Sequence, residues 1–412
     1  MKSVLGTICA AALLGAIAAA PAGATNGMDM IGYGARSIGM GGADVAVDGD
    51  ASAAAGGNPA VVAKAAPSSA NLGLTALMPV MTYRDPFQEV DGKKETFWMP
   101  SLGYVHSVAG MPWAFGVGAY AQGGMGVHFG GVMTPAGTQD QMLSEVGFLR
   151  VNPLASYKVN DDLSLGASVM IGYAKAMFNM FPKTPGMNSG LQVQDLASLG
   201  YAAKVGAQYC VGPKVRLGAT YTTQSAIDLD GGTATLNFGP GGLVKYDAEL
   251  KDFTWPQEVE AGVAYLPVPG LTIAADVKWI NWSSTIDTPK LKLSSPGSPV
   301  PPGYETMEIP FDMGWDDQLV FALGAEYVVG GKHALRAGVN YGKNPVPAAK
   351  LNPLFPAIPE THLTLGYGLN LGKWSVDAAY EHAFEKSQKS STLPIEIAHS
   401  QNTVSLGATY RY

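Results

Sequence analysis

The sequence predicts an all-β fold, a fourteen-stranded antiparallel transmembrane β-barrel with an N-terminal hatch inside its lumen. Apolar residues alternate with small or polar ones along most of the chain, and short turns alternate with long loops. Hydrophobic residues make up 47% and charged residues only 14%, against about 25% charged in soluble proteins. Beyond residue 24 no stretch approaches the ~18 consecutive apolar residues of a spanning helix. A closed barrel is then the remaining way to cross a membrane.

Residues 1–24 indicate export, since Lys2 precedes an apolar run that ends in the small-residue pattern Ala22-Gly23-Ala24. An uncleaved membrane anchor is the alternative, but the run is short for a span of about 20 residues. Cys9 has no lipobox before it, which argues against a lipoprotein. Cleavage before Thr25 leaves Cys210 as a lone thiol and therefore no internal disulfide. The net charge of −7 argues against a nucleic-acid partner.

Strict alternation of apolar with small or polar residues marks the strands. It is clearest at residues 163–173, 199–209, 319–327, 363–371, 374–381 and 403–412. A period of two with one apolar face is typical of a half-buried strand. The small and polar partners favour a lumen over the packed core of a soluble β protein, which is the alternative.

The connections between strands give their number. Short turns fall at residues 109–110, 160–161, 212–213, 268–269, 330–331 and 372–373. Long loops span roughly residues 84–95, 122–145, 175–196, 224–243, 283–316, 342–361 and 385–401. Six turns and seven loops join fourteen strands if residues 243–265 form one strand with a bulge or bend at Pro256. Splitting that stretch would give an odd number, whereas bacterial barrels are even-stranded.

Tyrosines support this arrangement, because five stand just before a short turn and a sixth ends the chain. Aromatic rings of this kind collect at membrane interfaces. We therefore expect one girdle on the periplasmic rim, with the long loops facing outward. Its members are Tyr104, Tyr157, Tyr209, Tyr265, Tyr327 and Tyr412.

The first expected strand spans residues 71–82, and the segment before it is rich in glycine, alanine and aspartate. A fourteen-stranded barrel is too wide to be filled by its own side chains, so this segment fits the lumen as a plug. A disordered periplasmic tail is the alternative. Asp44, Asp48 and Asp50 lack the ligand set of a calcium loop and fit caps and turns. We divide the chain into a signal peptide (1–24), a hatch (25–68) and a barrel (69–412).

The stretch SIGMGGADVAVDGDASAAAGGNPAVV, residues 37–62, resembles the hatch of the FadL/TodX (OmpP1/FadL) family. Its hatch markers are Ile38, Gly39, residues 48–51, and Asn58, Pro59 and Ala60; Gly56-Gly57 departs from the family pattern. FGVGA (115–119), WINWSS (279–284) and NPVPAAKLNPLFP (344–356) agree in the same order. The resemblance implies an outer-membrane transporter of long-chain fatty acids or hydrocarbons. In such a protein the ligand passes from an outer apolar patch to a pocket beside the hatch. It then leaves through a lateral opening at a kink in the third strand.

Five large apolar residues lie where an outward loop is expected: Met177, Phe178, Met180, Phe181 and Met187. An outward loop should be polar, and methionine adapts to varied ligand shapes, so we predict that they capture ligand or line its pocket. Packing within the loop itself or in the outer lipid leaflet is the alternative. The resemblance places a basic residue of the fatty-acid members at Met180, with Lys175 and Lys183 the nearest positive charges. This favours neutral hydrocarbons or mixed apolar ligands.

Gln122, Gly123 and Gly124 are the predicted lateral gate, because glycine inside a strand marks a bulge or kink. An ordinary strand end entering a loop is the alternative. In the hatch, Asn58 and Pro59 should fix the path of the chain.

Four basic residues fall on inward faces by parity: Arg150, Lys204, Arg216 and Lys278. Pairing with acids such as Asp276 is favoured over a ligand role.

The sequence contains no Gly-x-Ser-x-Gly or His-Glu-x-x-His motif, and its six histidines are scattered. We therefore predict no catalytic residues, no metal site and no cofactor, and keep an outer-membrane enzyme as a minor alternative. A general porin or a structural or adhesin barrel is the main alternative, although a porin needs a charged constriction and no plug. The expected partners are a hydrophobic ligand, the outer-membrane bilayer of a Gram-negative bacterium, and the barrel assembly machinery, through the C-terminal strand ending in Tyr412.

Overall fold

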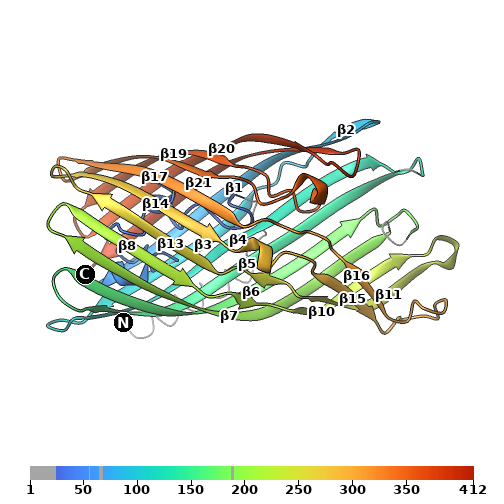
Figure 1. The fold of residues 1–412 in the computed structure, drawn as a ribbon, viewed down its shortest axis with the longest axis horizontal. Helices are drawn as coiled ribbons and strands as arrows, with labels where there is room; N and C mark the ends of the chain where they lie inside the picture. The colour runs from blue at the N-terminus through green and yellow to red at the C-terminus, as the bar shows by residue number, and fades with distance from the viewer. Residues whose placement is uncertain (1–24, 55, 65–67, 135, 187–189) are drawn as a thin grey trace.

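The first and the last strand of a continuous antiparallel sheet pair with each other and so close the sheet into a barrel (Figure 1). This computed structural model describes residues 25–54, 56–64, 68–134, 136–186 and 190–412, so the expected signal peptide and Met187 lie outside the described residues. The barrel has fourteen strands, as predicted. They are β1 (Ser69–Asp85), β3 (Phe97–Ser107), β4 (Trp113–Met133), β5 (Gln139–Lys158), β6 (Leu163–Met180), β7 (Leu191–Val211), β8 (Val215–Thr222), β13 (Glu258–Tyr265), β14 (Leu271–Ile280), β17 (Gln318–Val329), β18 (His333–Gly342), β19 (Thr361–Leu371), β20 (Trp374–Lys389) and β21 (Glu396–Arg411).

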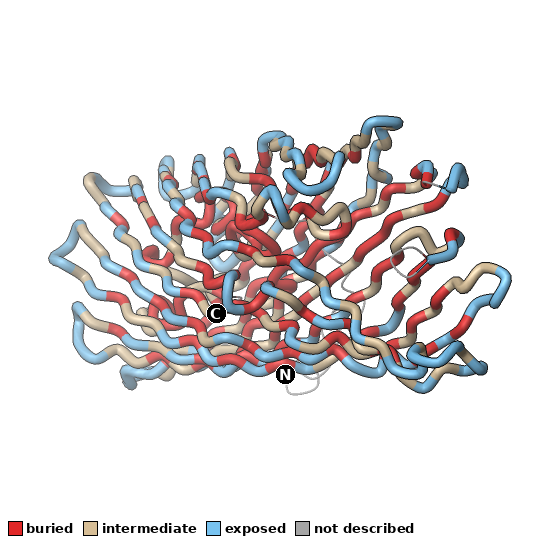
Figure 2. The backbone as a smooth tube through the Cα atoms, turned by 45° about the vertical axis from the view of Figure 1, so that its right-hand side comes forward, coloured by how far each residue is buried: buried red, intermediate tan, exposed pale blue. Residues whose placement is uncertain are grey.

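The two faces of the wall alternate as the sequence predicts. Along β19, Leu363 and Leu365 are exposed to the outside, whereas His362 and Thr364 are fully buried on the inside. Figure 2 shows the same alternation of buried and exposed residues along neighbouring strands. An apolar outer face and a polar inner face are what a barrel in a lipid bilayer requires.

The six predicted short turns all lie at one end of the barrel, between the strands that they were expected to join. The expected tyrosine girdle lies at this rim, where Tyr104 stacks on Tyr412 with ring centres 6.4 Å apart. Trp113 and Trp374, which begin β4 and β20, add to it through ring contacts with Tyr157 and Tyr410. The opposite end carries further strands (Figure 1).

One strand expectation is wrong: residues 243–265 form two long strands with the two-residue strand β12 (Thr254–Trp255) between them. β11 (Leu243–Lys251) pairs with β10 (Leu229–Asn237) and β15 (Lys290–Ser294), whereas β13 pairs with β8 and β14. Asp252, with φ of 60°, begins the break between them. β10, β11, β15 and β16 (Met307–Pro310) extend the wall from the outer half of β7, so the count of fourteen barrel strands survives the split.

Three of the expected long loops are much shorter than predicted. β4 continues to Met133 and β5 begins at Gln139, while β6 runs to Met180 and β7 begins at Leu191. Only residues 390–395 separate β20 from β21. Strands that project beyond the bilayer need no apolar outer face, so their alternation is weak and the sequence pattern ends before the strands do.

The shorter elements lie between these strands. None of the described helices is long and apolar enough to span a membrane. The remaining elements are β2 (Gln88–Asp91), β9 (Ser225–Ala226), β12 (Thr254–Trp255), the α-helix α2 (Ala35–Gly39) and the 3-10 helices η1 (Pro59–Lys64), η2 (Gly239–Gly241), η3 (Trp282–Ser284) and η4 (Ala348–Lys350).

The N-terminal segment lies inside the barrel, and glycines of the wall receive its backbone. A methyl group on Gly206 of β7 would overlap the side chain of Asn58, and one on Gly166 of β6 would overlap the backbone at Pro59 and Ala60. The same holds at four more glycines that face hatch backbone: Gly103, Gly218, Gly324 and Gly338. Inward glycines therefore create the room that the hatch occupies.

Candidate functional site

Asn58 anchors the hatch to the wall through backbone hydrogen bonds, of which only the bond with Ala60 is to backbone nearby in the chain. Its Nδ2 donates to the carbonyl of Val45 at 2.8 Å and to that of Ala207 on β7 at 3.0 Å. Its Oδ1 accepts from the amide of Ala60 at 3.0 Å. One buried side chain thus joins two turns of the hatch to β7. Ile38 and Gly39, the other predicted hatch residues, lie in α2 and are buried.

Charged residues fasten the opposite side of the hatch. Arg36, which follows the first residue of α2, forms an ion pair with Glu326 of β17 at 3.0 Å. Glu326 also accepts from Arg336 of β18 at 2.6 Å, and Arg336 reaches Asp377 of β20 at 2.7 Å. The Glu326 carboxylate beside Arg36 raises the pKa of that guanidinium, which stays charged. A single ion-pair network therefore joins the hatch to three barrel strands.

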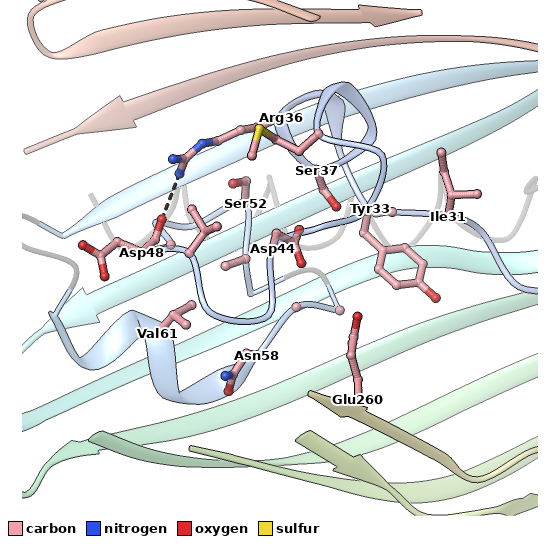
Figure 3. Close-up of a pocket in the computed structure, with 18 of the residues that line it drawn as sticks. Ile31, Tyr33, Arg36, Ser37, Asp44, Asp48, Ser52, Asn58, Val61 and Glu260 are labelled. Atoms are coloured by element: carbon pink, nitrogen blue, oxygen red, sulfur yellow. Dashed lines mark hydrogen bonds between the residues drawn. The ribbon is translucent and has the colours of Figure 1, made fainter. Parts of the chain in front are cut away.

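The hatch aspartates take structural roles. Figure 3 shows Asp44 and Asp48 around a cavity of about 50 Å³ that has a mixed polar and apolar lining, with Arg36 donating to the carbonyl of Asp48 at 2.9 Å. Burial raises the pKa of Asp44. Burial acts in the same direction at Asp50, but Arg36, two hydrogen bonds from Ser52 and the charge of Arg411 outweigh it and lower the pKa of Asp50. Turn and wall contacts therefore explain these acids, as the sequence favours.

Inward basic residues pair largely with hatch groups rather than with Asp276. Lys278 lies 3.5 Å from Asp29, and Arg216 lies 2.8 Å from Asp48. Lys204 donates to the carbonyl of Gly56 at 2.8 Å. Asp276 instead accepts from the backbone amide of Val45 at 2.9 Å. Arg150 is buried as well, and it has no carboxylate partner among the described ion pairs.

An apolar pocket lies inside the outer half of the barrel. Its free volume is about 30 Å³, whereas a cavity that admits benzene measures about 150 Å³. The pocket is therefore too small for a ligand of the size of benzene, and such a ligand must displace side chains to enter. It is lined by Met28, Val146, Ala176, Phe178, Leu250, Phe253, Ile286, Pro289, Phe311, Met313 and Phe355.

Of the four predicted ligand residues that the structure describes, Phe178 alone lines this pocket, although it lies at the end of β6 rather than in a loop. Its ring packs edge-to-face on Phe311, with ring centres 5.1 Å apart. Met180 and Phe181 are partly buried against the same apolar cluster, and Met177 is half-buried on β6. Met187 lies outside the described residues. The expectation of a loop is thus wrong for Met177, Phe178 and Met180.

Aromatic rings extend this apolar surface toward the hatch. Phe148 of β5 contacts Trp255, Trp255 contacts Trp282, and Trp282 contacts Trp315, with ring centres 4.7, 5.9 and 5.4 Å apart. All four side chains are buried. Trp282 belongs to the WINWSS motif. Only the family resemblance drew attention to this motif, and nothing in the sequence predicted that Trp282 packs against Trp255 and Trp315.

The wall is interrupted beside the predicted gate. β4 pairs with β3 only up to Tyr120, opposite Ser101, and the pairing of β4 with β5 shifts register between Ala121 and Gly123. Residues 121–127 of β4 are buried on both faces. The hatch segment 28–30 occupies the free edge: Gly124 donates to the carbonyl of Met28 at 2.9 Å, and Asp29 forms a bridge with Gly123.

Gln122 completes this contact, since its amide lies 3.4 Å from a carboxylate oxygen of Asp29 and 3.4 Å from one of Glu258. The three predicted gate residues therefore all contact the start of the hatch or its partners. Met28 has two roles in this arrangement, because its side chain lines the apolar pocket and its carbonyl holds β4.

The comparisons with known proteins agree with this architecture. The family model described as "Outer membrane protein transport protein (OMPP1/FadL/TodX)" matches residues 12–412. The chain belongs to the OmpP1/FadL/TodX family. A comparison with curated sequences gave no match.

Solved structures of OmpP1/FadL/TodX type share the fold at low sequence identity. The Pseudomonas putida toluene transporter TodX is 20% identical with a TM-score of 0.80, and a Pseudomonas aeruginosa FadL homologue is 19% identical with a TM-score of 0.74. The Ralstonia pickettii toluene transporter TbuX is 23% identical with a TM-score of 0.72. Each alignment covers 93% of this chain and 99% of the other.

The OmpP1/FadL/TodX family consists of outer-membrane transport channels rather than enzymes. The chain is therefore an outer-membrane transport barrel. Its apolar pocket, its hatch and the interruption of its wall at β4 are the structural features relevant to transport.

Proposed function

We propose that this protein carries hydrophobic small molecules, such as long-chain fatty acids or hydrocarbons, across the outer membrane by diffusion, without a catalytic reaction. One observation supports it above all: a pocket lined only by apolar residues shares Met28 with the contact that fills the gap beside β4. Wetting apolar surface costs about 25 cal/mol per Å², so an apolar route is better for such a ligand than a polar bore.

The proposed route begins at Phe178, Met180 and Phe181, the apolar residues at the outer end of β6. A ligand that enters the pocket displaces the flexible side chain of Met28. The hydrogen bond from Gly124 to the carbonyl of Met28 then weakens, and residues 28–30 leave the edge of β4. The ligand leaves sideways between β3 and β4, at Gln122, Gly123 and Gly124, while the hatch keeps the lumen closed.

Two further assignments belong to this proposal. The hatch comprises residues 25–68, since β1 begins at Ser69, with the signal peptide at 1–24 and the barrel at 69–412. The barrel assembly machinery recognises the C-terminal strand, which ends in Tyr412 directly after β21.

Uptake by host cells that lack their own transporter of this family tests the function. Cells that produce the barrel should take up ethylbenzene or dodecanoate faster than control cells, with uptake of a small hydrophilic sugar unchanged. Faster sugar uptake with unchanged hydrophobic uptake would instead show the porin alternative.

A further inference from the structure

Arg150 lies on the inner face of β5 as a buried cation without an acidic partner. Its side chain is 1% exposed. Nη1 donates to the thioether sulfur of Met170 at 3.6 Å, and the guanidinium carbon lies 4.8 Å from the ring centre of Phe148. Within the described parts of the chain, no acceptor meets Nε or Nη2. The Tyr120 hydroxyl is a further, uncharged hydrogen-bond partner of the guanidinium. A thioether is a weak acceptor and a phenol carries no charge, so this guanidinium has no close counterion among the described residues to offset its removal from water.

The other inward basic residues have stronger partners. Lys278 and Arg216 each pair with an aspartate of the hatch, and Arg336 pairs with two acids of the wall. Glu258 interacts electrostatically with Arg150, but its interactions with Lys278 and Lys204 are larger, and its carboxylate accepts from Gln122. Arg150 therefore lacks the close acidic partner that Lys278, Arg216 and Arg336 each have.

Arg150 also occupies a distinctive place along β5. Inward positions of this strand alternate, and Val146, Phe148, Arg150 and Asn152 follow one another toward the hatch. Val146 lines the apolar pocket, and Asn152 donates to the hatch carbonyl of Ala54 at 2.8 Å. At ~3.3 Å per residue, Arg150 lies about 13 Å along the strand from Val146. It thus stands between the pocket and the hatch, with an aromatic ring above it.

We propose that Arg150 binds the carboxylate of an amphipathic ligand whose hydrocarbon part occupies the apolar pocket. The free donors on Nε and Nη2 match the two oxygens of one carboxylate, the bidentate geometry that arginine favours. This rests on the transport function proposed above and names its substrate class, hydrophobic monocarboxylates. The positive charge that is missing at Met180 is then supplied from β5, contrary to the expectation of neutral ligands.

Binding to the purified full barrel tests the assignment with two probes that differ in their head group. Equilibrium dialysis at pH 8.5, in one uncharged detergent, compares radiolabelled dodecanoate with 1-dodecanol. Wild type should bind dodecanoate more tightly. Arg150→Met should weaken dodecanoate binding by about tenfold or more, as expected for the loss of hydrogen bonds to a charged group, and should change dodecanol binding less than about twofold.

Lys175→Met is the matched control, because Lys175 is an exposed cation on β6 and its removal should leave both affinities unchanged. Equal effects of Arg150→Met on both probes, or no effect on dodecanoate while both still bind, would overturn the Arg150 assignment and leave transport standing. If wild type binds neither probe, the proposed function fails as well. Should Arg150→Met not fold, equal wild-type affinity for the two probes overturns the assignment.

Discussion

Phe178 contacts Phe311 across the apolar pocket and comes from the stretch that the sequence singles out. Phe178→Ala should lower hydrophobic uptake by about tenfold, since buried aromatic anchors carry a large share of binding energy. It should also destabilise the barrel by about 3–5 kcal/mol, as for other buried phenylalanines. Initial uptake rates measured at equal amounts of folded barrel check this.

Leu154→Ala is the control for Phe178→Ala. Leu154 lies on β5 and, like Phe178, it is buried on the inner face of the wall. It packs among hatch residues away from the pocket. Its loss should destabilise the fold while leaving uptake per folded barrel near the wild-type rate. Equal losses of uptake in both variants would contradict a ligand role for Phe178.

Asn58 offers a second test at the scale of one residue. Asn58→Ala removes its three hydrogen bonds to the hatch and β7 and leaves buried backbone groups unpaired, at about 1–3 kcal/mol each. The hatch should loosen, so that protease added from the periplasmic side cuts residues 25–64 faster, while heat-dependent gel mobility still reports a folded barrel. Unchanged cleavage would remove Asn58 as an anchor.

The sequence predicts that Asn58 bonds backbone nearby in the chain, which describes its bond with Ala60. Its bonds to Val45 and to Ala207 of β7 depend on long-range packing and had no sequence signal. The sequence also located Phe178, whose apolar neighbours are unusual in an outer position. It missed Met28, Phe311 and Phe355, which reach the pocket from the hatch and from two connections between strands. Only long-range packing brings these segments together, and no periodicity within any one of them signals it.

β4 is the element on which the lateral route depends. Gly123→Leu should lower hydrophobic uptake several-fold, because a side chain at this position overlaps the carbonyl of Met28 and disturbs the contact between hatch residues 28–30 and β4 on which the lateral route depends. Its thermal unfolding midpoint should fall as well, since hatch backbone has to move. Gly130→Leu on the same strand is the control, since the nearest atom to an added Cβ there is 3.7 Å away. Uptake rates and thermal unfolding midpoints of both variants are the measurements. Equal uptake by wild type and Gly123→Leu would remove the lateral gate.

At this scale the sequence predicted strand order and turns well, because lipid on one side and a polar lumen on the other enforce a period of two. It failed where that constraint ends. It predicts loops at the outer parts of β4, β5 and β6, and a single strand at residues 243–265, where the structure has β11 and β13. Outside the bilayer the outer face is no longer restricted to apolar residues, so strand and loop look alike in sequence.

For the whole molecule, the hatch and the wall are complementary surfaces. Glycines on β3, β4, β6, β8, β17, β18 and β19 face hatch backbone, and ion pairs from Arg36, Asp48 and Asp29 reach β17, β8 and β14. Such contacts on several sides hold the hatch in the bore. From sequence alone, the width of a fourteen-stranded barrel predicted that something must fill it, but not which wall residues would receive the hatch.

Ionic conductance of single barrels in planar bilayers tests most directly whether the hatch closes the lumen and leaves hydrophobic ligands to a side route. Deletion of residues 25–64 provides the open reference, and wild type is measured under the same salt and voltage. We predict near silence for wild type and a steady current for the deleted barrel. A large, steady current through wild type would contradict the account, because an open bore would carry solutes past the hatch.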